Sequence, residues 1–460
     1  MRYVSTRGRA PELGFADVLL AGLAADGGLY VPAWWPKLEP ARSRASYVDR
    51  AVEVMMPFVE PDIDEVTLTH LCREAYVSFR HPAVTPLVQL DHQQWLMELF
   101  HGPTLAFKDV ALQLVGRLFD HVLAARGERV TIVGATSGDT GSAAIEAVSG
   151  CAHVDIVILF PDGRTSEVQR RQMTTVTASN AHAVAVDGTF DDCQDLVKAM
   201  FNDADFRSRH RLSAVNSINW ARVMAQVVYY VVASETFAGP TTFSVPTGNF
   251  GNVLAGWIAR EMGAPIDRFV VASNTNDILT RFIEHDDMST REVVHTLSPS
   301  MDIQVSSNFE RLLFEMNGRD GGMTSEQLTR FRSTGVLSIE ADQRRTYLEG
   351  SFRAAAVDDA HTTEEIGRIY RDTGVLIDPH TATATAAARL LAGPGGAIAP
   401  VVTLGTAHPA KFPEAVLEAT GRRPQLPDHL ADLFDRPERV EHAANDLADV
   451  QRVVERLTRS

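Results

Sequence analysis

The sequence predicts an α/β fold built on largely parallel sheets, because short runs rich in β-branched residues alternate with helical patterns along most of the chain. Strands that alternate with helices form parallel sheets covered on both faces. The second observation is length, since 460 residues with 45% apolar content are enough for two or three subdomains around a sizeable core. The predicted strands are Val130 to Val133, Val154 to Phe160, Ala183 to Val186, Phe243 to Val245, Phe269 to Ala272 and Val401 to Leu404.

Three segments are expected along the chain. Residues 1–90 combine a start rich in glycine and proline with helical patterns such as Tyr47 to Phe58, which predicts a helical N-terminal subdomain. Residues 91–430 are expected to form the α/β core of two lobes, with the smaller lobe at roughly 130–240. Residues 431–460 are charged and helix-prone, so we expect a helical C-terminal extension there.

Composition excludes several classes of partner. The chain carries 43 basic and 59 acidic residues, and a net charge of −16 argues against nucleic acid or an anionic membrane as a partner. No run approaches the about 20 apolar residues that span a bilayer, and the start lacks a charged segment followed by an apolar run, so we expect a cytoplasmic protein. Three cysteines without C-x-x-C spacing, Cys72, Cys151 and Cys193, are interpreted as packing residues.

Two of the predicted strands run directly into glycine-rich turns that open helices. Glycines let the backbone approach a ligand, while unpaired N–H groups and the helix dipole attract an anion. Neither turn matches a nucleotide-binding signature, which leaves a phosphorylated cofactor, a phosphorylated substrate, or both. The turns are Thr136-Ser137-Gly138-Asp139-Thr140 and Thr247-Gly248-Asn249-Phe250-Gly251-Asn252.

A lysine stands at a third helix start, in the segment HGPTLAFKD. The helix dipole disfavours a cation at this position, so Lys108 needs a reason to be there. One interpretation is a solvated lysine whose stem covers apolar neighbours. The other is that Phe107 and its neighbours desolvate the amine, which lowers its pKa and makes it suited to form a Schiff base.

Five strings in this order resemble the long-chain branch of threonine synthase, a fold type II pyridoxal-phosphate enzyme similar to the tryptophan synthase β chain. They are HGPTLAFKD, ATSGDTGSAA, NSINWAR, PTGNFGN and GTAHPAKF, and YVSTRG, DGGLYVP and SPSMDIQVSSNFERLLFE extend the resemblance to about Thr420. The resemblance implies a parallel-sheet, two-lobed catalytic core. Residues after about 430 match nothing diagnostic.

The same resemblance assigns roles to individual residues. It makes Lys108 the covalent carrier of pyridoxal 5′-phosphate, and it places the hydroxyl of Thr406 at the pyridine nitrogen. The implied cofactor-binding residues are Lys108, Phe107, Asp139, Thr247, Gly248, Asn249, Phe250, Gly251, Asn252 and Thr406. The implied substrate-binding residues are Thr136, Ser137, Gly138, Asp139 and Thr140 for the carboxylate, and Asn216, Ser217 and Arg222 for a phosphate.

Two points stay open at this level. Asp139 would lie beside the 3-hydroxyl of the cofactor, so its protonation state is undecided. NSINWAR has a purely structural interpretation as a helix start, with Asn219 as N-cap and Arg222 solvated, although the neighbouring motifs favour the phosphate site. The scattered histidines His101, His380 and His408 are not interpreted as ligands, and no metal is expected.

The implied reaction converts O-phospho-L-homoserine and water into L-threonine and phosphate, in a monomer or small homo-oligomer. The freed Lys108 would act as the general base. The main alternative is a threonine synthase-like phospholyase, which releases 2-oxobutanoate, ammonia and phosphate. A non-catalytic paralogue would lack the lysine, and a dinucleotide oxidoreductase would need a fingerprint that is absent from this sequence.

Overall fold

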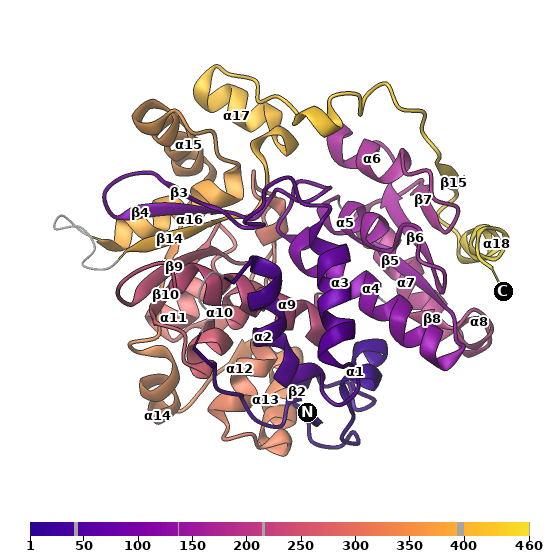
Figure 1. Ribbon diagram of the computed structural model, residues 1–460, viewed down its shortest axis with the longest axis horizontal. Helices are drawn as coiled ribbons and strands as arrows, with labels where there is room; N and C mark the ends of the chain where they lie inside the picture. Colours follow the sequence, from indigo (N-terminus) through magenta and orange to yellow (C-terminus); the bar gives the residue numbers. More distant parts are fainter. Residues whose placement is uncertain (41–44, 137, 214–216, 393–399, 460) are drawn as a thin grey trace.

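The computed structural model describes residues 1–40, 45–136, 138–213, 217–392 and 400–459. Two separate sheets form the framework of the molecule (Figure 1). All pairs in both sheets are parallel except that of the edge strand β3 with β4. The larger sheet has the order β13 (Phe352–Ala356), β10 (Ile266–Ser273), β9 (Thr241–Pro246), β14 (Val401–Gly405), β4 (Gln94–Glu98) and β3 (Leu87–Gln89). The smaller sheet has the order β15 (Glu441–Ala443), β7 (Ala181–Val186), β6 (Val154–Pro161), β5 (Val130–Ala135) and β8 (Leu212–Ser213).

The six predicted strands are confirmed, and the α/β class with parallel sheets is confirmed with them. Three strands of the larger sheet, β3, β4 and β13, were not predicted. The segment QWLME of β4 is only partly apolar, and FRAAA of β13 contains mainly alanine, so neither carries the β-branched signal of a buried strand. Their positions follow from pairing with β14 and β10.

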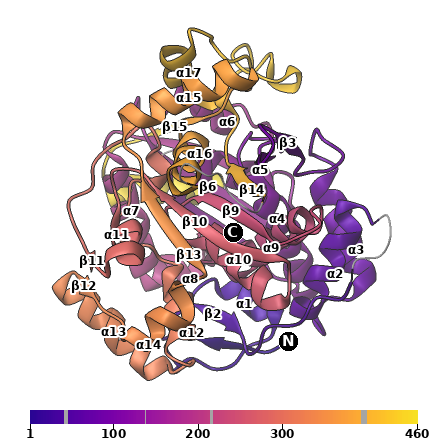
Figure 2. The same ribbon diagram turned by 90° about the vertical axis from the view of Figure 1, so that its left-hand side faces the viewer.

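Helices cover both faces of the larger sheet (Figure 2). Along β10, Phe269 and Val271 belong to the main core with α9 (Trp220–Ser234) and α10 (Gly251–Met262). The alternate residues Val270 and Ala272 instead pack with alanines of α16 (Pro379–Ala392), which α15 (Asp359–Thr373) covers. Residues on one strand thus face opposite layers, as expected for a strand buried on both sides.

The smaller sheet is also enclosed on both sides. One face packs against α4 (Lys108–Arg126), α5 (Asp139–Val148) and α6 (Glu167–Thr174). The other face packs against α7 (Phe190–Asn202), α8 (Ala204–Arg209) and α18 (Leu447–Leu457). The sequence analysis expected a helical extension at the C-terminus and did not foresee β15, which pairs with β7 and extends this sheet.

The N-terminal segment packs against the helices between the two sheets. It contains β1 (Tyr3–Ser5), α1 (Phe15–Ala21), β2 (Tyr30–Pro32), α2 (Tyr47–Val59) and α3 (Glu65–Tyr76), with α2 against α9 and α3 against α4. The remaining elements are α11 (Ile278–His285), β11 (Met288–Ser289), α12 (Phe309–Met316), α13 (Gly321–Thr334), β12 (Val336–Leu337), α14 (Ala341–Gln343) and α17 (Pro413–Thr420), with short turns at η1 (Pro299–Met301), η2 (Arg344–Leu348), η3 (Pro409–Lys411) and η4 (Asp428–Leu430). Within the described ranges, no helix is both long enough and apolar enough to cross a membrane.

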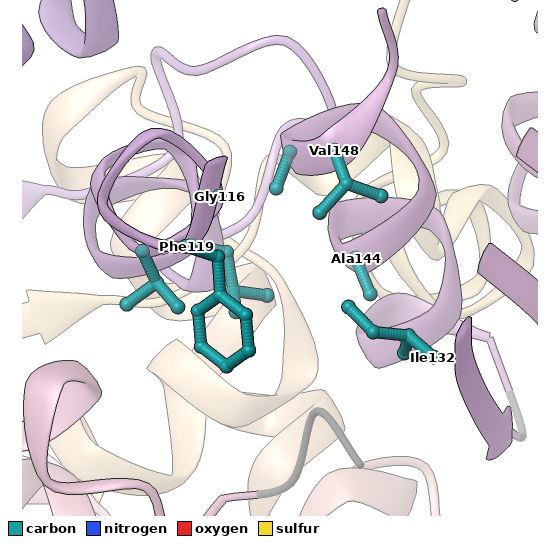
Figure 3. Close-up of a pocket in the computed structure, with 8 residues that line it drawn as sticks. Gly116, Phe119, Ile132, Ala144 and Val148 are labelled. Atoms are coloured by element: carbon teal, nitrogen blue, oxygen red, sulfur yellow. The ribbon is translucent and has the colours of Figure 1, made fainter. Parts of the chain in front are cut away.

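The close packing of α4 on α5 determines how the starts of these two helices, at Lys108 and Asp139, lie relative to each other. A cavity of only about 10 Å³ lies between them, lined by apolar residues that include Gly116, Phe119 and Val148 (Figure 3). A Cβ atom built on Gly116 would lie 2.2 Å from the carbonyl oxygen of Ala147. Only glycine therefore allows the two helices to approach this closely.

We expect Gly116→Ala to lower the free energy of unfolding by about 1–3 kcal/mol, because the added methyl must push α4 away from α5. Urea unfolding followed by circular dichroism measures the loss. Gly239→Ala is the matched control, because no atom lies within 4 Å of its added Cβ. Equal stability of the two variants would contradict the proposed role of Gly116.

Candidate active site

Lys108 is a buried lysine at the first residue of α4, with only 7% of its surface exposed. Its Nζ lies 4.9 Å from the centroid of the Phe107 ring. Burial lowers the pKa of the Lys108 amine even though Asp139 acts in the opposite direction. The structure thus favours the desolvated amine over the solvated lysine, the alternative that the sequence left open.

The segment around Thr406 lies directly beside the Lys108 loop. The N–H of Phe107 donates to the carbonyl oxygen of Thr406 at 2.8 Å, and the N–H of His408 donates to that of Leu105 at 3.0 Å. These bonds join the end of β14 to the start of α4, although some 300 residues of chain separate them. The Thr406 hydroxyl makes no hydrogen bond to another described residue, so it is free to contact a ligand.

Asp139 links Lys108 to a second lysine. Its Oδ2 lies 3.4 Å from Nζ of Lys108, while its Oδ1 lies 2.7 Å from Nζ of Lys411 and accepts from Nε2 of Gln169 at 2.9 Å. Burial alone would raise the pKa of the Asp139 carboxyl, but the charges of Lys411 and Lys108 hold it well below its usual value. The two lysine charges therefore favour the ionised carboxyl group in the ligand-free site.

The turn between β9 and α10 presents backbone N–H groups to one side. Ser306 donates from its hydroxyl to the carbonyl oxygen of Gly248 at 2.8 Å, and Asn308 donates from N and Nδ2 to that of Asn249 at 3.1 and 3.0 Å. The N–H groups of Gly248, Asn249 and Phe250 make no hydrogen bond to any described residue. Because Ser306 and Asn308 hold the carbonyls and a helix starts at Gly251, this turn has the features of an anion site.

Two side chains of this turn belong to the scaffold. The hydroxyl of Thr247 donates to the carbonyl oxygen of Val245 at 2.7 Å. Oδ1 of Asn252 accepts from the hydroxyls of Tyr229 and Tyr230 at 2.5 and 3.0 Å. The anion contacts available here therefore come mainly from the backbone.

The turn after β5 is closed in part by its own side chain. The Thr136 hydroxyl accepts from the N–H groups of Gly138 and Gly141 at 3.0 and 2.9 Å. Thr140 is half-buried and its hydroxyl has no partner among the described residues, so it is available to a ligand. Ser137 lies outside the described residues.

The NSINWAR segment agrees in part with each of its two interpretations. Asn219 is the N-cap of α9 and accepts from the N–H of Ala221 at 3.0 Å, as the structural interpretation expected. Arg222 is nevertheless buried, with 4% exposed, and its Nε and Nη1 have no hydrogen-bond partner among the described residues. Burial lowers the pKa of Arg222 to about 10, and the Arg222 charge is one of those that lower the pKa of Lys108.

The rest of that segment adjoins the anion turn. The carbonyl oxygen of Ser217 accepts from Nδ2 of Asn308 at 3.0 Å, and the same amide group holds Asn249. Asn308 therefore ties the start of the NSINWAR segment to the turn between β9 and α10. Asn216 lies outside the described residues.

Comparison with known proteins agrees with this geometry. Residues 79–406 match the family model described as pyridoxal-phosphate dependent enzyme, residues 2–76 match threonine synthase N terminus, and residues 381–454 match threonine synthase, C-terminal. A threonine synthase from Pseudomonas aeruginosa is 55% identical over 462 residues, covering 99% of this chain and 98% of the relative. The chain belongs to the threonine synthase family.

Solved threonine synthases have the same fold. A pyridoxal-phosphate-bound threonine synthase from Brucella melitensis superimposes with a TM-score of 0.97 and 49% identity, covering all of both chains. The yeast threonine synthase gives a TM-score of 0.94 and 38% identity, covering 99% of this chain and 98% of that one. The fold is therefore that of a fold type II pyridoxal-phosphate enzyme, as the sequence resemblance implied.

The site fits the cofactor of the threonine synthase family, pyridoxal 5′-phosphate. Lys108 would supply a buried amine for the aldehyde, and the three N–H groups between Thr247 and Gly251 that have no described partner would supply donors for the phosphate. The Thr406 hydroxyl would be a neutral partner for the ring nitrogen. The assignments of single residues to the cofactor or the substrate stay predictions.

Three residues near this threonine synthase site were missed in the sequence analysis. Lys411 and Asn308 lie inside strings quoted for the resemblance, GTAHPAKF and SPSMDIQVSSNFERLLFE, so their positions carried a signal. Gln169 lies in α6, EVQRRQMT, where nothing in the sequence separates it from a surface glutamine. Its contact with Asp139 arises because α6 packs on α5.

Proposed function

We propose that this chain converts O-phospho-L-homoserine and water into L-threonine and phosphate, with Lys108 as cofactor carrier and general base and Arg222 as the ligand of the substrate phosphate. One observation supports this most directly. The structure contains a buried amine with a lowered pKa, Lys108, and a buried guanidinium, Arg222, whose Nε and Nη1 have no partner among the described residues. The first suits the cofactor aldehyde, and the second suits a dianion.

Pyridoxal phosphate, when bound, supplies an electron sink that stabilises negative charge at the carbon atoms next to the substrate nitrogen. Lys108 would hold the cofactor through its amine, and the same amine, once free, would remove the proton from the α-carbon of the substrate. The lowering of the Lys108 pKa by burial supports this role, because it increases the uncharged fraction of the amine, which is the form that accepts a proton. The same amine is placed to return that proton later in the reaction.

Arg222 holds the phosphate while the bond to the γ-carbon breaks. Negative charge grows on the leaving oxygen in this step, so a guanidinium fixed beside it stabilises the transition state more than the bound substrate. Burial of Lys108 and Arg222 excludes bulk water, which favours controlled addition of one water at the β-carbon over early release of 2-oxobutanoate. The turn at Thr136 to Thr140 receives the substrate carboxylate.

Product analysis tests this function against the phospholyase alternative. We expect holoenzyme with O-phospho-L-homoserine to release L-threonine and inorganic phosphate in equal amounts, measured by amino-acid chromatography and a phosphate assay. Lys108→Arg is the negative control, because it keeps the charge but cannot carry the aldehyde. Equal amounts of 2-oxobutanoate and phosphate, with no threonine, would identify a phospholyase.

The remaining expectations are part of the same proposal. The net charge of −16 supports a protein without a nucleic-acid partner. The small-molecule substrate, the cytoplasmic location and a monomer or small homo-oligomer agree with this function. Size-exclusion chromatography with light scattering measures the oligomeric state.

A further inference from the structure

Lys411 is a second lysine buried in the site, and the mechanism above does not use it. It ends the turn η3 and has 0% of its surface exposed. Its Nζ donates to the carbonyl oxygen of Thr104 at 2.8 Å and pairs with Oδ1 of Asp139 at 2.7 Å. Burying an ammonium group completely is costly unless it is paired, so this position requires its carboxylate partner.

The Asp139 carboxylate is shared unequally between two lysines. Its distance to Nζ of Lys411 is 2.7 Å, whereas its distance to Nζ of Lys108 is 3.4 Å. Lys411 and Gln169 both hold Oδ1, which leaves Oδ2 facing Lys108. The carboxylate is thus oriented and neutralised mainly from the side away from the cofactor lysine.

We propose that Lys411 is a positioning residue whose charge balances Asp139, so that Lys108 can be an uncharged amine when the cofactor arrives. The inference rests on the proposed role of Lys108 as cofactor carrier. Only an uncharged amine has the lone pair that attacks an aldehyde. Without Lys411, the Asp139 carboxylate would pair with Lys108 alone and hold it as an ammonium ion.

Two other charged groups belong to the elements around Lys108 and Asp139. Arg222, from α9, adds a positive charge that also lowers the pKa of Lys108. Asp109, from α4, accepts from the N–H and hydroxyl of Thr104 at 2.8 and 2.6 Å. Burial raises the pKa of Asp109 to about 6, although the hydrogen bonds from Thr104 lower it. Asp139 is therefore the carboxylate that pairs directly with Lys108.

The test measures cofactor capture by the apoenzyme rather than turnover. Apoenzyme is mixed with pyridoxal phosphate across a pH series, and the rate of appearance of the bound-cofactor absorbance is recorded. The rate falls as pH drops through the pKa of Lys108, so a raised pKa moves the midpoint to higher pH. For Lys411→Met we expect the midpoint of the rate against pH to move up by about one pH unit or more, because the loss of a neighbouring positive charge raises the pKa of Lys108.

Two further variants test whether the midpoint moves in the direction that the lost charge requires. Asp139→Asn removes the negative charge instead, so its midpoint should move to lower pH than that of the wild type. The double variant Lys411→Met with Asp139→Asn removes both charges, and its midpoint should return to within about half a unit of the wild type. A merely structural role for Lys411 would not produce this restoration.

Each outcome supports or overturns the inference. An unchanged midpoint in Lys411→Met, or a double variant that matches Lys411→Met alone, overturns it. Thermal melting of each apoenzyme shows whether it is folded. If Lys411→Met is not folded, the test rests on the other two variants, and the midpoint of the double variant must then lie at higher pH than that of Asp139→Asn and near that of the wild type. Failure of the proposed function is seen separately, as wild-type holoenzyme that makes no threonine or carries its cofactor on another lysine.

Discussion

Replacing Lys108 by alanine should abolish turnover, because the covalent carrier of the cofactor and the base at the α-carbon are lost together. Loss of the proton-transfer role alone is expected to cost roughly 100- to 10,000-fold in kcat. The measurement is steady-state phosphate release from O-phospho-L-homoserine. Cofactor absorbance of the purified variant should lack the signal of the lysine-bound form.

Lys411 is the main alternative to Lys108 as the carrier of the cofactor, because it is the other lysine paired with Asp139. Borohydride reduction of the wild-type holoenzyme, followed by peptide mapping, should place the pyridoxyl group on Lys108. A label on Lys411 would reverse the two roles. Lys108→Arg controls for charge, since it keeps a cation at the helix start but cannot form the linkage.

Arg222→Met should lose activity and gain stability at the same time. Removal of a charge-assisted phosphate contact is expected to cost about 2–4 kcal/mol of transition-state stabilisation, or roughly 30- to 1000-fold in kcat/KM. The ligand-free protein, however, contains a buried guanidinium whose Nε and Nη1 have no described partner. Its replacement by an apolar side chain of similar length should raise the free energy of unfolding by about 1–4 kcal/mol.

Arg311→Met provides the matched control. Arg311 is also buried, but it donates to the carbonyl oxygens of Tyr30 and Ile218 at 3.0 and 2.6 Å and to Oδ1 of Asn308. Its replacement leaves these acceptors unpaired and should destabilise the protein. Kinetics and thermal melting of both variants, with Arg222→Lys beside them, measure the effects. Near-wild-type kinetics in both Arg222 variants would mean that the substrate phosphate is bound elsewhere.

The strands with a strong local signal could be predicted, and those defined by their neighbours could not. Val154 to Phe160 is a continuous apolar run, which indicates a buried strand without further information. FRAAA of β13 and the three residues of β15 become strands through pairing with β10 and β7. Their sequences contain no property that separates them from helix or loop.

For the candidate site, the sequence indicated individual residues but not their arrangement. Lys108, the two glycine-rich turns and Arg222 could be selected from the sequence because each belongs to a local pattern or a family string. Their mutual distances could not, since they depend on the contact of α4 with α5 at Gly116 and on the pairing of the Phe107 and Thr406 loops. A solvated Arg222 belonged to the structural interpretation of NSINWAR, which the neighbouring motifs did not favour, and the burial of Arg222 excludes it.

By itself, the sequence determined the fold class, the family and the residue types that chemistry requires, because these depend on local periodicity and on ordered motifs. Only the tertiary structure decided the charge state of the site. The ionisation of Asp139 depends on Lys411, which is 272 positions further along the chain but only 2.7 Å away in space. The strength of an electrostatic interaction depends on the distance between the charges and on their burial, and the folded chain determines both quantities.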